Sequence, residues 1–211
     1  MIYHNEPQGS EAWLIARAGV ITASKFKDAR AKLKNGDPAE KQLNYAAQVA
    51  VERIAGKPVE MVFVSWQMKA GSAEEFLPRQ RYEADRAEFI EEAGFITTDD
   101  RRFGVSVDGF INDDGVLEIK TICSPAKMVA LWRDKDFSEY IDQCNGAMWL
   151  LGRKYVDLVI WCPALEPIGK EMMVHRILRD DNAIEKLEAD MLKFADLVDQ
   201  YEAALRMPVA A

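Results

Sequence analysis

The stretch RFGVSVDGFINDDGVLEIKTI, from Arg102 to Ile122, decides the fold that we expect for this chain. Two runs rich in Val, Ile and Phe flank a segment of Asn, Asp and Gly, which is the pattern of a β-hairpin. A three-residue loop of Asp113, Asp114 and Gly115 fits this segment, because a glycine adopts the left-handed conformation without steric cost. The prediction is a hairpin whose strands pair around this loop.

The loop length sets the register of the hairpin, and the register sets which side chains meet. This loop places Asp108 opposite Lys120, with Glu118 one diagonal away. Since residues two apart on a strand share a face, the polar residues are expected on one side: Ser106, Asp108, Glu118 and Lys120. Two carboxylates and an ammonium this close together indicate a metal-dependent hydrolytic centre. The alternative is an ordinary half-exposed sheet whose ion pairs contribute little.

The composition is that of a globular protein with one core. The chain has 211 residues, 49% hydrophobic and 29% charged, which suits a single domain over residues 1–211. No apolar run approaches the roughly 20 residues of a membrane span, and no signal peptide is visible. We therefore expect a cytoplasmic protein without a membrane partner. Its three cysteines are expected to be buried free thiols: Cys123, Cys144 and Cys162.

Residue counts restrict the kind of metal that could bind. The chain has only two histidines, His4 and His175, so a histidine-rich transition-metal site is hard to build. Carboxylate and carbonyl oxygens remain as ligands, and these favour Mg²⁺ or Mn²⁺. The net charge of -8 argues against a surface coated with nucleic-acid-binding residues, but it permits a local basic groove.

Residues 17–34 carry the parts of a phosphate site. Ser24 is expected to cap a helix running to about Leu33, and Arg17 ends the short helix before it. Free N–H groups at a helix start, a hydroxyl and a guanidinium together suit a phosphate. A basic run begins in the same helix at Lys25, which makes it a candidate DNA contact. The alternatives are plain helix capping for Ser24, a surface ion pair for Arg17 and a solvated basic face for the run from Lys25.

Apolar periodicity and terminal signals predict the remaining elements. Helices are expected at residues 10–17, 39–55, 71–92, 126–132, 136–152 and 182–205, the third interrupted by Pro78 and the fifth opened by a capping box of Asp136 and Glu139. Extended segments are expected at residues 20–22, 59–66, 155–161 and 172–177. Residues 155–161 are nearly all apolar, which is typical of an interior strand. The elements predict an α/β fold.

Five short motifs, taken in order, resemble the bacteriophage lambda exonuclease family, the YqaJ-like viral alkaline exonucleases among the restriction-endonuclease-like nucleases. They are Arg17 with GVITAS at 19–24, Gly71 with Glu75, SVDG at 106–109, LEIK at 117–120, and Tyr140 with Gln143. The resemblance runs from about residue 13 to residue 149. It implies a restriction-endonuclease-like fold, with a central mixed β-sheet that carries the catalytic hairpin and is flanked by helices.

The resemblance also implies roles for the acidic cluster. Asp108, Glu118 and the backbone carbonyl of Ile119 match the metal ligands of the family. Glu75 matches a further acid that helps to hold a second metal ion or its water. Lys120 matches the group that orients the nucleophilic water and balances developing charge.

Other positions match the family's contacts with DNA. Arg17, Ser24 and Ser106 correspond to the pocket for a terminal 5′-phosphate, and Gln143 corresponds to a residue beside the scissile phosphate. Met68 occupies the place of an apolar wedge that separates the terminal base pair. These matches predict a substrate of duplex DNA with a 5′-phosphate.

The family forms ring-shaped trimers around DNA, degrades one strand of a duplex in the 5′-to-3′ direction, and works with a single-strand annealing protein in recombination. The resemblance therefore implies an Mg²⁺- or Mn²⁺-dependent 5′-to-3′ exonuclease, a homotrimer and an annealing partner. Two alternatives stay open. One is an endonuclease or junction nuclease of the same fold, and the other is a catalytically silent DNA-binding module that uses the basic helix.

Overall fold

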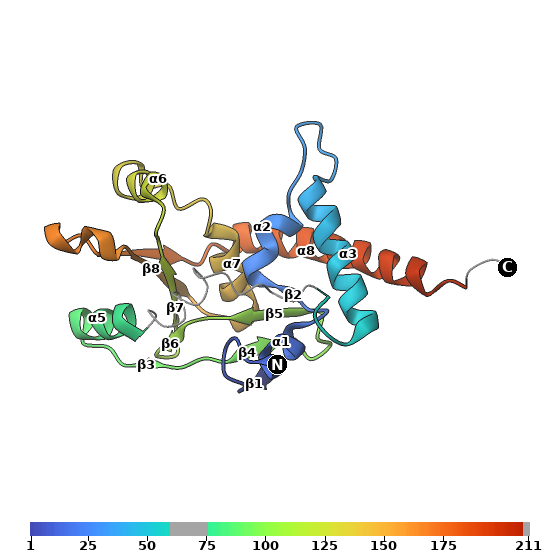
Figure 1. Ribbon diagram of the computed structural model, residues 1–211, viewed down its shortest axis with the longest axis horizontal. Coiled ribbons are helices and arrows are strands. Elements are labelled where there is room, and N and C mark those ends of the chain that lie inside the picture. Colours follow the sequence, from blue (N-terminus) through green and yellow to red (C-terminus); the bar gives the residue numbers. More distant parts are fainter. Residues whose placement is uncertain (60–75, 209–211) are drawn as a thin grey trace. The chain divides into compact units, whose positions relative to one another are not determined.

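The computed structural model describes residues 1–59 and 76–208. Internal contacts divide the chain into two compact units, drawn together in Figure 1. The first unit takes residues 1–61, 94–106 and 180–211, and the second takes residues 62–93 and 107–179. The single domain expected over residues 1–211 stays a prediction. The elements expected within residues 60–75, including that part of the helix from residue 71, lie outside the described residues.

The first unit has a four-stranded sheet in the order β1-β4-β5-β2. Its strands are β1 (Ile2–His4), β4 (Phe95–Thr97), β5 (Phe103–Ser106) and β2 (Ile21–Thr22). The strand β2 runs parallel to β5, and the other neighbours are antiparallel. The helical elements are α1 (Glu11–Arg17), the 3-10 turn η1 (Ala23–Lys25), α2 (Phe26–Ala29), α3 (Glu40–Ala55) and α8 (Asp181–Arg206).

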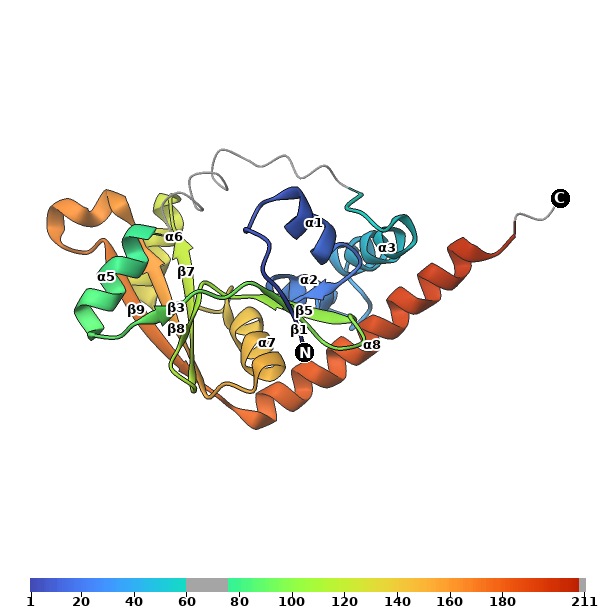
Figure 2. The same ribbon diagram turned by 90° about the horizontal axis from the view of Figure 1, so that it is seen from below.

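The helices α1, α3 and α8 lie where the sequence predicts them. Ser10 caps α1 by accepting a hydrogen bond from the Trp13 N–H at 3.2 Å. Gly56, in the left-handed conformation, ends α3. Figure 2 shows α8 as one long helix, and the ring of its Phe194 stacks on Tyr45 of α3 with 5.3 Å between centroids. Terminal signals and apolar periodicity were therefore sufficient to predict these three elements.

The helix expected from Ser24 to about Leu33 is wrong in its cap and in its end. Ser24 lies exposed inside the 3-10 turn η1 and caps nothing, and α2 ends at Ala29. The cause lies in the turn-forming residues 35–38, which reverse the chain early. After the reversal, the Leu33 N–H donates to the Asp37 carbonyl at 2.8 Å. Residues 31–34 therefore do not continue the helix.

The second unit has a five-stranded mixed sheet in the order β3-β6-β7-β8-β9. The strands are β3 (Ile90–Glu91), β6 (Gly109–Ile111), β7 (Gly115–Thr121), β8 (Tyr155–Trp161) and β9 (Met172–Leu178). The middle strand β7 runs parallel to β8, and the other pairs are antiparallel. The helical elements are α5 (Phe76–Arg86), α6 (Pro125–Val129), the π-helical turn η2 (Ala130–Asp134), α7 (Ile141–Leu151) and the 3-10 helix η3 (Pro163–Ile168). The predicted interior strand 155–161 is confirmed.

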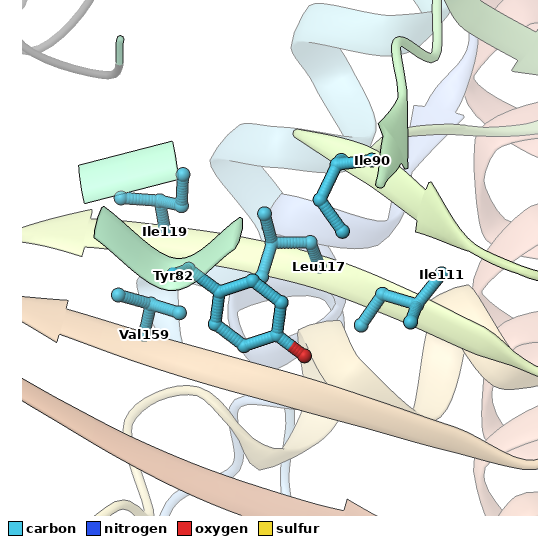
Figure 3. Packing of buried hydrophobic residues seen from close by; sticks show 6 residues of the cluster. All are labelled: Tyr82, Ile90, Ile111, Leu117, Ile119 and Val159. Carbon is cyan, nitrogen blue, oxygen red and sulfur yellow. The ribbon is translucent and has the colours of Figure 1, made fainter. Parts of the chain in front are cut away.

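One face of this sheet carries a hydrophobic cluster (Figure 3). Its members come from α5 and from four strands: Tyr82, Ile90, Ile111, Leu117, Ile119 and Val159. Leu117 and Ile119 alternate with Glu118 and Lys120 along β7. Because successive side chains of a strand point to opposite faces, the two charged residues belong to the other face.

The hairpin forms, but its register differs by two residues from the expected one. Ile111 pairs with Gly115, so the loop is 112–114, and the left-handed residue is Asn112 at φ 50°. Gly115 lies in β7 instead, at a position that requires glycine because a Cβ there would collide with the ring of Tyr155 on β8. A shift of two residues preserves the faces of the strands, so the expected side for Glu118 and Lys120 is retained.

The first arm of the hairpin is not one strand. Ser106 ends β5 and pairs with Phe95 in the sheet of the first unit, so it does not share a sheet face with Glu118 as expected. Between β5 and β6, Asp108 N–H donates to the Leu117 carbonyl at 3.1 Å, although Leu117 is the register partner of Gly109. Two successive residues thus oppose one, which is a β-bulge.

The helix α7 is shorter than expected. It begins at Ile141 and ends before the left-handed Gly152, and no capping box forms at its start. Asp136 Oδ1 instead accepts a hydrogen bond from the Ser138 N–H at 3.0 Å, and Glu139 pairs with Lys127 at 2.8 Å. Asp136 thus forms a local Asx turn and is not available for the capping box.

All three cysteines are free thiols, as expected. Cys144 and Cys162 are buried, but Cys123 is exposed because it follows the end of β7. Among residues 1–59 and 76–208, no helix has the length and apolar composition to cross a membrane.

Candidate active site

The acids and the lysine of the hairpin meet on the α7 side of the second sheet. Lys120 Nζ lies 2.6 Å from Glu118 Oε1, and Gln143 Nε2 of α7 donates to the same oxygen at 2.5 Å. The Glu118 side chain is only 6% exposed. A buried carboxylate needs such partners, since an unpaired charge is costly away from water. Strand parity placed Glu118 and Lys120 together correctly, whereas only the resemblance tied Gln143 to the site.

Asp108 joins this cluster through the β-bulge. Its Oδ2 accepts a hydrogen bond from the Ile119 N–H at 2.5 Å. The bond fastens the aspartate to the strand that carries Glu118 and Lys120, at the position where β6 stops pairing in register. The bulge therefore re-aims the Asp108 side chain toward the β7 backbone instead of leaving it opposite Lys120 as predicted.

The two carboxylates of the cluster stabilise the positive charge of Lys120. Burial alone would lower the pKa of Lys120, but the attraction of Glu118 and of Asp108 outweighs it and raises that pKa above its usual value. Lys120 is therefore a charged donor. Burial, together with the nearby Glu118 charge, raises the pKa of the Cys144 thiol, which keeps it neutral. Burial raises the pKa of Tyr140 to about 12.

The donor atoms of the cluster suit a hard divalent cation. The carboxylates of Asp108 and Glu118 offer oxygen donors, and the resemblance adds the backbone carbonyl of Ile119. Mg²⁺ and Mn²⁺ prefer oxygen ligands. The histidines are engaged elsewhere, since His4 lies 3.3 Å from Thr97 Oγ1 and His175 stacks on Phe137 with 4.0 Å between ring centroids.

The acids of this cluster are few. In the described ranges, no group of three or more His, Cys, Asp and Glu side chains gathers to hold a metal ion. The expected ligand set has only two such side chains in these ranges, Asp108 and Glu118. Its third member, Glu75, lies outside the described residues, as does Met68.

A second cluster lies in the first unit, around Arg17. Its Nη1 donates to Ser106 Oγ at 2.9 Å, so the structure joins two of the residues expected to bind a 5′-phosphate. The guanidinium lies 4.3 Å from the centroid of the Trp13 ring and 5.0 Å from that of Phe95. These two rings fix the guanidinium through cation–π contacts. Burial lowers the pKa of Arg17, with Tyr45 and Glu52 opposing it, yet an arginine stays charged in proteins.

Two other residues expected to contact DNA, Ser24 and Lys25, make their hydrogen bonds elsewhere in the first unit. Ser24 Oγ lies 3.5 Å from Thr22 Oγ1, and its side chain is exposed. Lys25 is also exposed and pairs with Asp28 at 3.1 Å. Their roles stay predictions.

Sequence reasoning missed the two rings that hold Arg17. Trp13 lies four residues before Arg17 on α1, and residues at that spacing share a helix face, so this contact had a readable signal. Phe95 comes from β4, far along the chain, and gave no local signal.

A mixed sheet with an acid–lysine cluster on one face is the arrangement expected of a nuclease of the restriction-endonuclease-like class. A family model described as the YqaJ-like viral recombinase domain matches residues 12–154. The chain therefore belongs to this family, as its motifs predicted. A comparison with curated proteins gives no match.

Solved structures agree with this assignment. The alkaline exonuclease LHK-Exo from Laribacter hongkongensis is 30% identical, with a TM-score of 0.81 over 93% of this chain and 97% of that chain. The structure of LHK-Exo in complex with dAMP matches at 31% identity with the same TM-score and coverage. A phage-related exonuclease from Haemophilus somnus 129PT is 13% identical with a TM-score of 0.70, over 88% of this chain and 96% of that chain, and this similarity concerns the fold alone.

Proposed function

We propose that this nuclease is a metal-dependent 5′-to-3′ exonuclease that degrades duplex DNA from 5′-phosphorylated ends. The observation that carries the proposal is the buried Glu118 carboxylate, contacted on one oxygen by both Lys120 and Gln143, with Asp108 fastened beside it. Support also comes from LHK-Exo, which is named an alkaline exonuclease and has been crystallised with a nucleoside monophosphate.

Asp108, Glu118 and the Ile119 carbonyl would hold Mg²⁺ or Mn²⁺, with Glu75 as a further acid. Such an ion, when bound, supplies an activated water and positive charge at the scissile phosphate. The two contacts that Glu118 makes with the described part of the chain use one of its oxygens, whereas an ionised carboxylate offers about four acceptor sites. Acceptor capacity for a cation therefore remains.

The neighbouring side chains have separate tasks in this proposal. Lys120 keeps its proton, so it orients the attacking water and balances negative charge on the phosphate. Gln143 holds Glu118 in place through its amide N–H and lies beside the scissile phosphate. Both groups are fixed on regular elements, β7 and α7, which favours a well-defined geometry.

The Arg17 cluster would bind the terminal phosphate. A guanidinium offers several N–H donors in a fixed plane, and Trp13 and Phe95 have already restricted its motion. Ser106 and Ser24 would add hydroxyl donors, Lys25 would contact the DNA backbone, and Met68 would act as the wedge. A site for a terminal phosphate favours chain ends as substrates.

Membership of a family described as viral recombinases supports the remaining assignments. We infer that the protein works in phage-type recombination with a single-strand annealing protein, as a homotrimer that encircles DNA, in the cytoplasm of the host cell.

One digestion tests the proposed activity. Linear duplex with either a 5′-phosphate or a 5′-hydroxyl is incubated with and without Mg²⁺, beside closed circular duplex. We expect metal-dependent release of nucleotides, faster from the phosphorylated end, with the circle left intact. Cutting of the circle would identify an endonuclease, and binding without turnover would identify a silent DNA-binding module.

A further inference from the structure

Three hydrogen bonds join the helix α3 to the segment between α1 and η1. Glu52 Oε2 accepts from the Gly19 N–H at 3.0 Å, and Arg53 Nε donates to the Gly19 carbonyl at 3.0 Å. Tyr45 Oη accepts from the Thr22 N–H at 2.9 Å. The helix therefore fixes the backbone at both ends of residues 19–22.

The segment 19–22, held by these bonds, adjoins two residues of the proposed phosphate site. Gly19 follows Arg17 by two residues, and Thr22 precedes Ser24 by two. Gly19 has φ +74°, and a Cβ on it would lie 2.8 Å from Arg53 Cγ, so this turn requires glycine. The turn sets the direction in which the chain leaves Arg17.

Glu52 is buried, and each of its oxygens accepts a hydrogen bond. It is 7% exposed, and its second oxygen accepts from Gln48 Nε2 at 2.9 Å. A helix does not need such a carboxylate for its own backbone bonds, and a buried charge is costly unless it is well bonded. Burial likewise raises the pKa of Tyr45, which keeps its hydroxyl neutral as an acceptor.

We propose that Glu52 and Tyr45 are positioning residues for recognition of the 5′-phosphate. They hold the turn that aims Arg17 at Ser106, and neither touches DNA. This inference rests on the proposed 5′-phosphate site. It predicts a specific defect. Loss of the hydrogen bonds from α3 weakens the binding of phosphorylated ends but leaves the cluster of Asp108, Glu118 and Lys120 intact.

The test measures kcat and KM on matched duplexes with a 5′-phosphate or a 5′-hydroxyl. Glu52→Ala should raise KM for the phosphorylated end about tenfold, the effect of losing one hydrogen bond to a charged group. The value of kcat and the KM for the hydroxyl end should stay within about twofold. Glu52→Gln should restore the preference, because its amide oxygen still accepts from the Gly19 N–H. Glu40→Ala, an exposed acid in the first turn of the same helix, is the control.

Tyr45→Phe keeps the ring stacked on Phe194 and removes only the oxygen that accepts from Thr22, so it decides the question if Glu52→Ala does not fold. Selectivity lost in Tyr45→Phe supports the inference, and selectivity equal to wild type overturns it. Equal loss on both kinds of end in Glu52→Ala would also overturn it. A wild-type enzyme without any phosphate preference would refute the 5′-phosphate site itself, and with it this inference.

Discussion

Two buried carboxylates on neighbouring strands of the second unit have opposite surroundings. Asp157 on β8 accepts hydrogen bonds on both oxygens, at 2.6 Å from Tyr82 Oη and at 2.7 Å from each of Arg176 Nε and Nη2. Glu118 on β7 makes its two contacts with described residues through one oxygen. Leu117 is the register partner of Asp157, so the two acids lie one residue apart and point to opposite faces.

The contrast is the one expected between a structural acid and the metal ligand that we propose Glu118 to be. Asp157 is enclosed by donors that are fixed in the folded chain, and it packs behind the hydrophobic cluster of Tyr82. Glu118 keeps acceptor capacity on the face where Lys120 and Gln143 converge. Under the proposed function, one sheet would use its two faces for different purposes, with stability on the α5 side and chemistry on the α7 side.

The largest expected effect is at the α7 face. Glu118→Gln keeps the shape and one acceptor oxygen but removes the charge, so nuclease activity should fall by about 1,000-fold or more while the fold is retained. Metal-dependent digestion of linear duplex measures this. Glu139→Gln, an acid paired with Lys127 at the surface, should retain activity. Full activity in Glu118→Gln would remove Glu118 from the site.

The converse change is Asp157→Asn on the α5 face. It should lower the free energy of unfolding by about 3 kcal/mol, because the Arg176 and Tyr82 donors lose a charged, buried acceptor. Urea unfolding gives the value, and turnover per folded molecule should stay near wild type. Asp190→Asn, which breaks a half-exposed pair with Arg30, should cost well under half as much. An Asp157→Asn variant that is as stable as wild type but inactive would show that Asp157 serves activity and not stability.

A smaller effect is expected in the first unit, where the hydrogen bonding of Arg17 matters as well as its charge. Arg17→Lys retains the charge but loses the flat group that lies against Trp13 and Phe95, so the preference for 5′-phosphate over 5′-hydroxyl ends should fall about tenfold. Competition between the two ends in one digest measures this ratio. An unchanged ratio would show that charge alone is sufficient there.

The smallest effect is a pH dependence that should appear at Asp157. Burial alone would raise its pKa, but the hydrogen bonds from Arg176 and Tyr82 outweigh burial and hold the pKa below its usual range. A depressed folded-state pKa gives stability that is present above the unfolded pKa of about 4 and is lost as the pH falls through the folded value. The stability difference between wild type and Asp157→Asn should therefore shrink below about pH 4. A difference that stays constant from pH 6 to the acid limit would contradict this linkage.

The sequence predicted those parts of the molecule that depend on local pattern. The helix α3 ends at Gly56, α8 follows its apolar stripe, and β8 is interior because its residues are nearly all apolar. The meeting of Glu118 with Lys120 followed from strand parity, which survives a register shift of two residues.

Features that depend on distant contacts were not predictable. Gly115 is required by the ring of Tyr155, which lies on another strand, so the turn residue was wrongly assigned. The bulge at Asp108 results from a hydrogen bond to Leu117 and carries no sequence signal. Glu52 looks like any acid on a helix, and only the fold shows that Gly19 donates to it.

The exposed position of Cys123 offers a practical handle. The other two thiols are buried, and burial raises the pKa of Cys162 to about 11 and also raises that of Cys144, which suppresses their reactive thiolate forms. A maleimide dye should therefore attach at one place, three residues beyond Lys120. A fluorophore there would report the arrival of DNA at the strand that we propose to carry the chemistry, without adding or removing a cysteine.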